Sequence, residues 1–210
     1  FLGRVTLNDI QDNSAYEKFK EFDAILSLPD ADLAKDLNSV LRLWLRRFVI
    51  DFRPNHGPGS TADAGGRSLQ EKYQHMMFYD QMLSYPFARF GRKITDFLPD
   101  GATRGPMRRI SRLVCVPKTA IKKRTICEEP AILQYFQQMV KNALYDYMGI
   151  CPYLVGHVRL NDQALNREAA RVGSITGSIS TIDLSNASDS VSLDLARIAF
   201  RGTPLLPWLY

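Results

Sequence analysis

Cysteine is scarce in this sequence, and the few potential metal ligands do not form a known pattern. The 210 residues include three Cys and three His, with no Cys-x-x-Cys pair and no His-Glu-x-x-His segment. These absences, together with the odd cysteine count, argue against a zinc site and against a disulfide framework. We therefore expect three reduced, mostly buried thiols, and packing or loop roles for the histidines.

Long apolar runs are also missing from the sequence. No segment approaches the roughly 18 to 20 unbroken apolar residues of a membrane-spanning helix, so we expect no membrane partner. Hydrophobic residues still make up 45% of the chain, which is enough for a buried core and excludes a wholly disordered protein. Because the chain starts at Phe1 and stops at Tyr210 without a polar tail, we expect a fragment of a longer protein.

Acidic residues are absent from one window, residues 101–127. That window holds eight basic residues, whereas the rest of the chain has 19 basic and 22 acidic ones, so the window supplies the whole net charge of +5. Concentrated positive charge suits phosphate contacts, although a solvated basic surface is the alternative. An apolar run at residues 113–116 is followed by Pro117 and Lys118, which predicts a cationic hairpin rather than a tail.

Apolar spacing predicts most of the remaining elements to be helices. We expect an amphipathic helix over residues 31–49, another before Pro29, and a third after the capping box of Ser68 and Glu71. Residues 53–67, with four Gly and two Pro, are expected to form a loop. The longest pattern predicts a helix over residues 131–148 that ends at Gly149, and residues 160–171 predict a polar helix.

Two carboxylates lie at the ends of predicted elements in the last part of the sequence. Residues 178–184 alternate like a strand, which places Asp183 near the carboxyl end of that strand. Asp189 follows a small polar turn and precedes a predicted helix over residues 190–200. A carboxylate at a strand end can bind Mg²⁺ together with substrate phosphates, although a turn or helix cap is the alternative role for both residues.

The residues around these features resemble a known family. Residues 180–193, STIDLSNASDSVSL, are similar to motif A of the RNA-dependent RNA polymerases of single-stranded RNA bacteriophages, the levivirus replicases. Residues 116–118, 124–126 and 129–130 resemble the basic motif F of these enzymes, and further similarities occur at residues 160–174 and 56–59. The similar segments follow the family's order over roughly residues 50–200. For the loop at residues 56–59 we expect a turn and no chemical role.

The resemblance implies an α+β fold, namely a fragment of a right-hand polymerase. Residues 1–168 would form a mostly helical N-terminal and fingers region, with motif F at about 112–130. Residues 169–210 would begin the catalytic palm with its first strand and helix. The family has a Gly-Asp-Asp motif and a motif B later in the chain; this sequence contains no Asp-Asp pair, so we expect the fragment to be inactive alone.

The resemblance also implies roles for individual residues. Asp183 would be catalytic and would bind the two Mg²⁺ ions, while Asp189 would lie near the incoming ribose or be structural. The nucleotide phosphates would be held by the motif F cations Lys118, Lys122, Lys123 and Arg124. Arg124 is the strongest candidate because its guanidinium can hold two oxygens, whereas the choice between the two adjacent lysines stays open.

The implied partners are an RNA template and product, nucleoside triphosphates, and the host elongation factors Tu and Ts with a small-subunit ribosomal protein. The implied location is the cytoplasm of the bacterial host. One alternative is a non-enzymatic RNA-binding module. Such modules stack bases on aromatic side chains, and residues 101–127 contain no Phe, Tyr or Trp, which argues against this alternative. A reverse-transcriptase-like palm is the other alternative.

Overall fold

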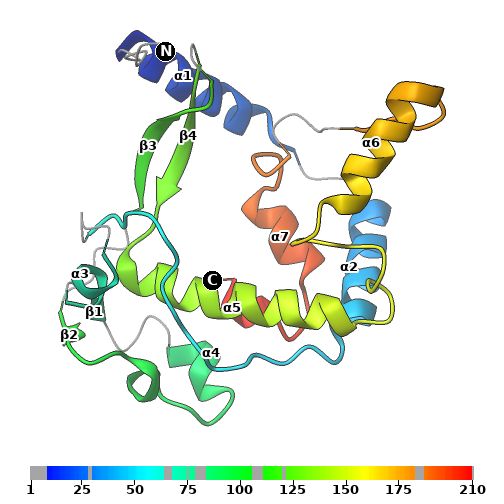
Figure 1. The fold of residues 1–210 in the computed structure, drawn as a ribbon. Coiled ribbons are helices and arrows are strands. Elements are labelled where there is room, and N and C mark those ends of the chain that lie inside the picture. The colour runs from blue at the N-terminus through cyan, green and yellow to red at the C-terminus, as the bar shows by residue number, and fades with distance from the viewer. Residues whose placement is uncertain are drawn as a thin grey trace. The chain divides into compact units, whose positions relative to one another are not determined.

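The computed structural model describes residues 9–27, 30–63, 68–74, 76–78, 84–105, 111–119, 122–182 and 187–209. It contains helices and two small sheets of two strands each, which agrees with the expected α+β class (Figure 1). By internal packing the chain divides into two compact units. The first comprises Phe1–Leu26, Ile50–Lys141 and Pro207–Tyr210, and the second comprises Ser27–Val49 and Asn142–Leu206. The functional boundary near residue 168 stays a prediction.

Most of the predicted helices form in the described residues. The helices are α1 (Asp9–Ile25), α2 (Ala31–Leu45), α3 (Leu69–Gln74), α4 (Ser84–Ala88), α5 (Ala131–Ile150), α6 (Ala164–Thr176) and α7 (Leu193–Ala199), with 3₁₀ turns η1 (Ile94–Phe97) and η2 (Leu206–Trp208). The strands are β1 (Met77–Phe78), β2 (Thr103–Arg104), β3 (Arg112–Pro117) and β4 (Lys123–Glu128). None of the helices in these described ranges is both long and apolar enough to cross a membrane.

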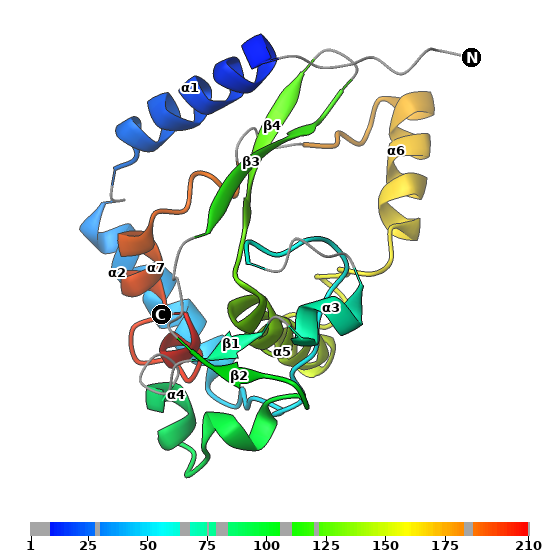
Figure 2. The ribbon, with the colours of Figure 1, turned by 90° about the vertical axis from the view of Figure 1, so that its left-hand side faces the viewer.

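The predicted cationic hairpin is present in the first unit. Strands β3 and β4 pair antiparallel, in a register that runs from Arg112 opposite Glu128 to Pro117 opposite Lys123. The β-branched and apolar side chains of β3 favour this extended pairing. Helix α1 packs against both strands and lies beside them in both views (Figures 1 and 2). The hairpin is therefore supported on one side by a helix from a distant part of the sequence.

Aromatic rings form the core of the first unit. Phe87 of α4 is fully buried, and its ring centroid lies 5.5 Å from that of Phe97, 5.1 Å from Phe136 and 5.3 Å from Trp208. Phe52 joins the same cluster, 5.1 Å from Phe97. Such ring pairs add about 0.5–1.5 kcal/mol each beyond the burial of their area. This cluster anchors the beginning of α5, which leads directly out of the hairpin.

The loop at residues 53–63 wraps around the start of α5. The Asp63 carboxylate accepts a hydrogen bond from the backbone N–H of Ala131 at 2.9 Å, which satisfies one of the free donors at a helix N-terminus. The predicted capping box is confirmed, because the Ser68 hydroxyl accepts from the Glu71 N–H and the Glu71 carboxylate accepts from the Ser68 N–H, both at 3.2 Å. Helix α3, which the box starts, is shorter than its apolar pattern predicts.

In the second unit, α2 packs against α7 (Figure 1). The side-chain amide of Asn38 donates to the backbone oxygens of Ala199 at 2.9 Å and Arg201 at 2.8 Å. These bonds satisfy carbonyls at the C-terminus of α7, which have no partner within the helix itself. Asp30 caps the start of α2 by accepting from two backbone N–H groups. The predicted helix over residues 31–49 is thus confirmed, although it ends at Leu45.

Four expectations about local structure are wrong. Helix α5 continues through Gly149 to Ile150, and α6 begins later and extends further than residues 160–171. Residues 178–182 are not a strand, because a strand requires a hydrogen-bonded neighbour and the described strands pair only within the two small sheets. The thiols are free, but of the three only Cys151 is buried, whereas Cys115 is half-buried and Cys127 is exposed.

Candidate nucleotide-binding hairpin

Strand alternation divides the side chains of the hairpin between two faces. Residues directly opposite each other in an antiparallel pair project to the same side, and neighbours along a strand project to opposite sides. Lys123 and Cys115 therefore belong to one face, together with the other odd-numbered positions. Arg124, opposite Val116, belongs to the other face with Arg112 and Glu128. The four predicted phosphate contacts do not all lie on one face.

Helix α1 packs on the odd-numbered face around Leu113, Cys115 and Lys123. Lys123 donates to the Asp12 carboxylate, and the Tyr16 hydroxyl donates to the Leu113 carbonyl at 3.5 Å. The Cys115 thiol lies 3.7 Å from the Asp12 carbonyl oxygen, close enough for a weak sulfur hydrogen bond. The Lys123 side chain is only 11% exposed in consequence. This lysine therefore points away from the side on which a nucleotide could approach the hairpin.

The even-numbered face is open and cationic. Arg124 is exposed on it, and Lys118 and Lys122 are exposed at the turn that joins the strands. The N–H of Lys118 donates to the carbonyl of Lys122 at 2.9 Å, so these two residues form the next opposed pair after Pro117 and Lys123. By alternation they belong to the same face as Arg124. In the part of the chain that the structure describes, none of these three side chains forms an ion pair. Their exposure makes them accessible to an anion.

Charge at the base of the hairpin is neutralised instead. Arg112 donates through Nε to the Glu128 carboxylate at 2.8 Å, and Ser60 donates to the other carboxylate oxygen. The Ser60 hydrogen bond, followed by the bond and charge of Arg112, lowers the pKa of Glu128 below its usual range. Ser111 donates to Glu129 at 2.6 Å beside this group. The free positive charge is therefore at the turn end of the open face.

The predicted carboxylate centre is only partly visible. Asp183 lies outside the described residues. Asp189 is in an exposed turn of the second unit, where its carboxylate lies 3.4 Å from the Ser188 hydroxyl. It does not cap the following helix, because α7 begins at residue 193 and its cap is Ser192, which accepts from the Leu195 N–H at 3.1 Å. Among the residues that the structure describes, no group of three or more His, Cys, Asp or Glu could hold a metal ion.

The structure reveals a buried basic pair that sequence reasoning missed. Lys72 of α3 is fully buried and donates to the Gly57 carbonyl at 2.6 Å, which holds the loop at residues 56–59 in place. His56 is buried between Tyr73 and Tyr135, each 5.3 Å away between ring centroids. Burial, and then the charge of Lys72, lower the pKa of His56, and burial lowers the pKa of Lys72. These contacts hold the loop at residues 56–59 in place, and the absence of a chemical role for it stays a prediction.

Asp12 was also missed as a partner of the basic window. It lies 111 residues before Lys123, and nothing in its local sequence distinguishes it from the other acidic residues of α1. The only available signal was helical spacing, because Asp12 lies four residues before Tyr16 and one turn before Ala15, which is buried. Such spacing indicates a contacting face of a helix but does not identify the element that it contacts.

Comparison with known proteins finds that the chain is similar to polymerase β chains of RNA bacteriophages. The RNA-directed RNA polymerase β chain of Enterobacteria phage GA is 44% identical over 80 residues, 38% of this chain. The polymerase β subunits of Enterobacteria phage SP and Escherichia virus Qbeta are 38% identical over 92 residues and 36% identical over 88, which are 44% and 42% of this chain. The matched stretches span only 14 to 15% of these relatives' lengths.

The family description "RNA replicase, beta-chain" matches residues 84–201, which is more than half of the chain. The matched range contains β3, β4, α5, α6 and α7, and it also contains residues 180–193. The chain therefore belongs to the RNA replicase β-chain family. Helices α1 and α2 and the loop at residues 56–59 lie before the matched range.

Proposed function

We propose that this chain is a segment of an RNA-directed RNA polymerase that replicates a viral single-stranded RNA genome. The observation that carries the proposal is membership of the replicase family over residues 84–201, a range that includes the basic hairpin. The open cationic face of that hairpin supports it, because nucleotidyl transfer requires positive groups that offset the charge of a triphosphate. The RNA template, the RNA product and the nucleoside triphosphates are the substrates and products of this proposed activity.

In the proposed complex, the open face binds the phosphates of the incoming nucleotide. Arg124 would hold two phosphate oxygens with its planar guanidinium, and Lys118 and Lys122 would contribute point charges at the turn. Of the two adjacent lysines, Lys122 is the better candidate because Lys123 is paired with Asp12 on the opposite face. These side chains would bind and orient the triphosphate without taking part in proton transfer.

Asp183 is the proposed metal ligand. Asp189 is proposed either to lie near the ribose of the incoming nucleotide or to have a structural role. The described residues alone do not fit a site for two Mg²⁺ ions, because they contain no suitable cluster of ligands. The remaining carboxylates would come from later parts of the replicase. Bound Mg²⁺ supplies charge stabilisation and activation of the attacking hydroxyl in such enzymes. The 210-residue chain by itself is therefore proposed to be inactive.

Primer extension by the complete replicase β chain that carries this segment tests the proposal. Asp183→Asn should abolish synthesis while RNA binding is retained, and Asp194→Asn should be active because the ion pair of Asp194 with Arg197 is exposed. Retained synthesis by Asp183→Asn would remove that residue from the metal site. Template-directed synthesis by the 210-residue chain alone would contradict its proposed incompleteness.

The same assay separates the competing functions. A non-enzymatic RNA-binding module would show salt-dependent RNA affinity with no synthesis in the complete chain, and a reverse-transcriptase-like palm would use deoxynucleotides in preference to ribonucleotides. The proposal extends by resemblance to the host elongation factors Tu and Ts, a small-subunit ribosomal protein, and the cytoplasm of the bacterial host. Co-purification of these factors with the complete replicase would test that extension.

A further inference from the structure

We propose that Asp12 and Lys123 are a positioning pair. Their ion pair holds the odd-numbered face of the hairpin against α1, so that Arg124 on the opposite, open face is directed toward the nucleotide phosphates. Lys123 is then not itself a phosphate ligand. The inference rests on the proposed function, because it concerns how the triphosphate site is oriented. It assigns a role to α1, which lies outside the residues that match the replicase family.

The ion pair is largely withdrawn from solvent. The side chain of Lys123 is 11% exposed and that of Asp12 is 31% exposed, and the two make a direct charge-assisted hydrogen bond. Removing one partner of such a pair leaves the other charge poorly solvated, which is more costly than losing an exposed surface pair. Lys123 would have to give up this partner to reach a phosphate on the opposite face.

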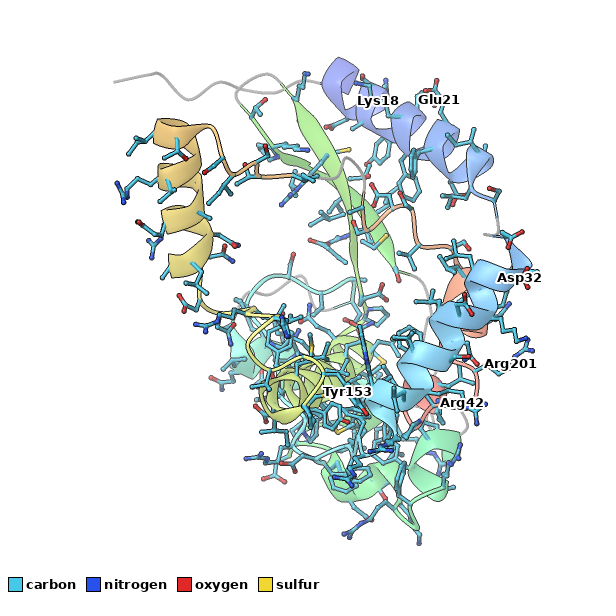
Figure 3. All side chains as sticks on the ribbon, turned by 90° about the vertical axis from the view of Figure 1, so that its right-hand side faces the viewer. Lys18, Glu21, Asp32, Arg42, Tyr153 and Arg201 are labelled. Carbon is cyan, nitrogen blue, oxygen red and sulfur yellow. The ribbon has the colours of Figure 1, made fainter. Side chains whose placement is uncertain are left out.

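Helix α1 contacts the hairpin with a single face. Asp12, Ala15 and Tyr16 are spaced so that they lie on one side of the helix, and each is buried or half-buried. On the other side of α1, Lys18 and Glu21 project away from the hairpin and are exposed (Figure 3). The contacts of Asp12 and Tyr16 with Leu113, Cys115 and Lys123 therefore define how the odd-numbered side of the hairpin is held.

Holding Lys123 constrains its neighbour. Lys123 and Arg124 are consecutive in β4, so their side chains leave the strand in opposite directions. A rotation of the strand that displaced Lys123 from Asp12 would rotate the Arg124 guanidinium away from the phosphates by the same angle. Small displacements of an orienting group reduce activity strongly, because bound reactants must be aligned. Asp12 is thus proposed to act on the nucleotide through Arg124.

Nucleotide titrations with the complete replicase β chain test this inference. Lys122→Ala and Arg124→Ala should each raise the KM for nucleotide about tenfold, the factor expected for one lost charge-assisted hydrogen bond. Asp12→Ala and Lys123→Ala should raise it by similar factors to each other, and the double alanine variant should be no worse than either. In an Arg124→Ala background, Asp12→Ala should have no further effect on KM, a coupling that general destabilisation would not produce.

The exchanged pair Asp12→Lys with Lys123→Asp should restore most of the nucleotide affinity, and Glu21→Ala should match the unaltered protein in KM. If either alanine variant fails to fold, Asp12→Asn, which keeps the shape of the side chain, should give an intermediate rise in KM. A raised KM for Lys123→Ala beside an unchanged KM for Asp12→Ala, with no recovery in the exchanged pair, would overturn the inference and make Lys123 a phosphate ligand. Absence of template-directed synthesis by the complete, unaltered replicase β chain would instead overturn the proposed function.

Discussion

Gly173 and Ile179 approach each other so closely that any side chain at residue 173 would displace the backbone of residue 179. A Cβ on Gly173 would overlap the carbonyl oxygen of Ile179 and would lie 3.2 Å from its carbonyl carbon. The approach follows from the end of α6, where Gly177 adopts a left-handed conformation with φ of 67° and donates to the Gly173 carbonyl at 2.8 Å. The chain then turns back, which brings residue 179 beside Gly173.

Gly173→Ala should therefore destabilise the chain by about 1–3 kcal/mol, because the backbone of residue 179 has to move to make room. Gly149→Ala is the matched control: Gly149 is also helical, a Cβ there meets nothing within 4 Å, and alanine should stabilise that helix by up to about 1 kcal/mol. Urea unfolding followed by circular dichroism measures both. Equal free energies of unfolding for the two variants would show that the close approach does not constrain residue 173.

Arg124→Ala should reduce nucleotide use by the complete replicase far more than it reduces RNA binding, because the open face of the hairpin is assigned to the triphosphate. Lys18→Ala removes an exposed cation from the far side of α1 and serves as the control for the loss of one charge. The measurements are the KM for nucleotide and a salt titration of RNA affinity. A uniform loss of affinity for all RNA, without a change in KM, would favour a plain RNA-binding surface.

Acid should weaken the fold through His56. Burial, and then Lys72, lower the folded-state pKa of His56 below 6.5, so the unfolded chain binds more protons as the pH falls below 6.5. Stability is therefore highest above that value and declines as the pH falls through it toward the lowered pKa. His56→Phe should remove part of the difference in urea midpoint between pH 7.5 and pH 5. An unchanged pH dependence in this variant would show that His56 does not titrate differently on folding.

The lowered pKa of Glu128 acts in a separate range of pH. The carboxylate is stabilised in the folded state by Ser60 and Arg112, so its contribution is present above 4.5 and is lost as the pH falls through the lowered folded value. Measurements between pH 7.5 and pH 5 therefore report mainly on His56. In a Glu128→Gln variant, the free energy of unfolding should still decrease between pH 7.5 and pH 5. Its further decrease below pH 4.5 should be smaller than in the unaltered protein.

Asn38→Ala should lower the free energy of unfolding by about 1–3 kcal/mol, because two carbonyl groups at the end of α7 lose their donor. Ser39→Ala is a neighbouring control, since the exposed Ser39 hydroxyl donates to the Lys35 carbonyl of its own helix. Its effect should stay within about 0.5 kcal/mol. Similar losses for the two variants would show that the bonds from α2 to the end of α7 contribute no specific stability.

Local patterns predicted the elements that are stabilised locally. The helix after residue 130 has acidic and Pro residues before it and a regular apolar face, and it begins at Ala131 as expected. The β3–β4 hairpin was predictable because its two strands are close in sequence and carry strand-forming residues. Residues 178–182 show a similar alternation, but no described strand pairs with them, so the pattern alone did not produce a strand.

The sequence by itself determined the family, the basic window and the set of cations that can meet a phosphate, because these depend on residue identity and order. Only the tertiary structure decided which of those cations remain available. Asp12 neutralises Lys123 from 111 residues away, while Lys118, Lys122 and Arg124 stay exposed on the other face. The physical reason is that pairing between charges depends on distance in space, and the packing of α1 on the hairpin brings one carboxylate to one side of it.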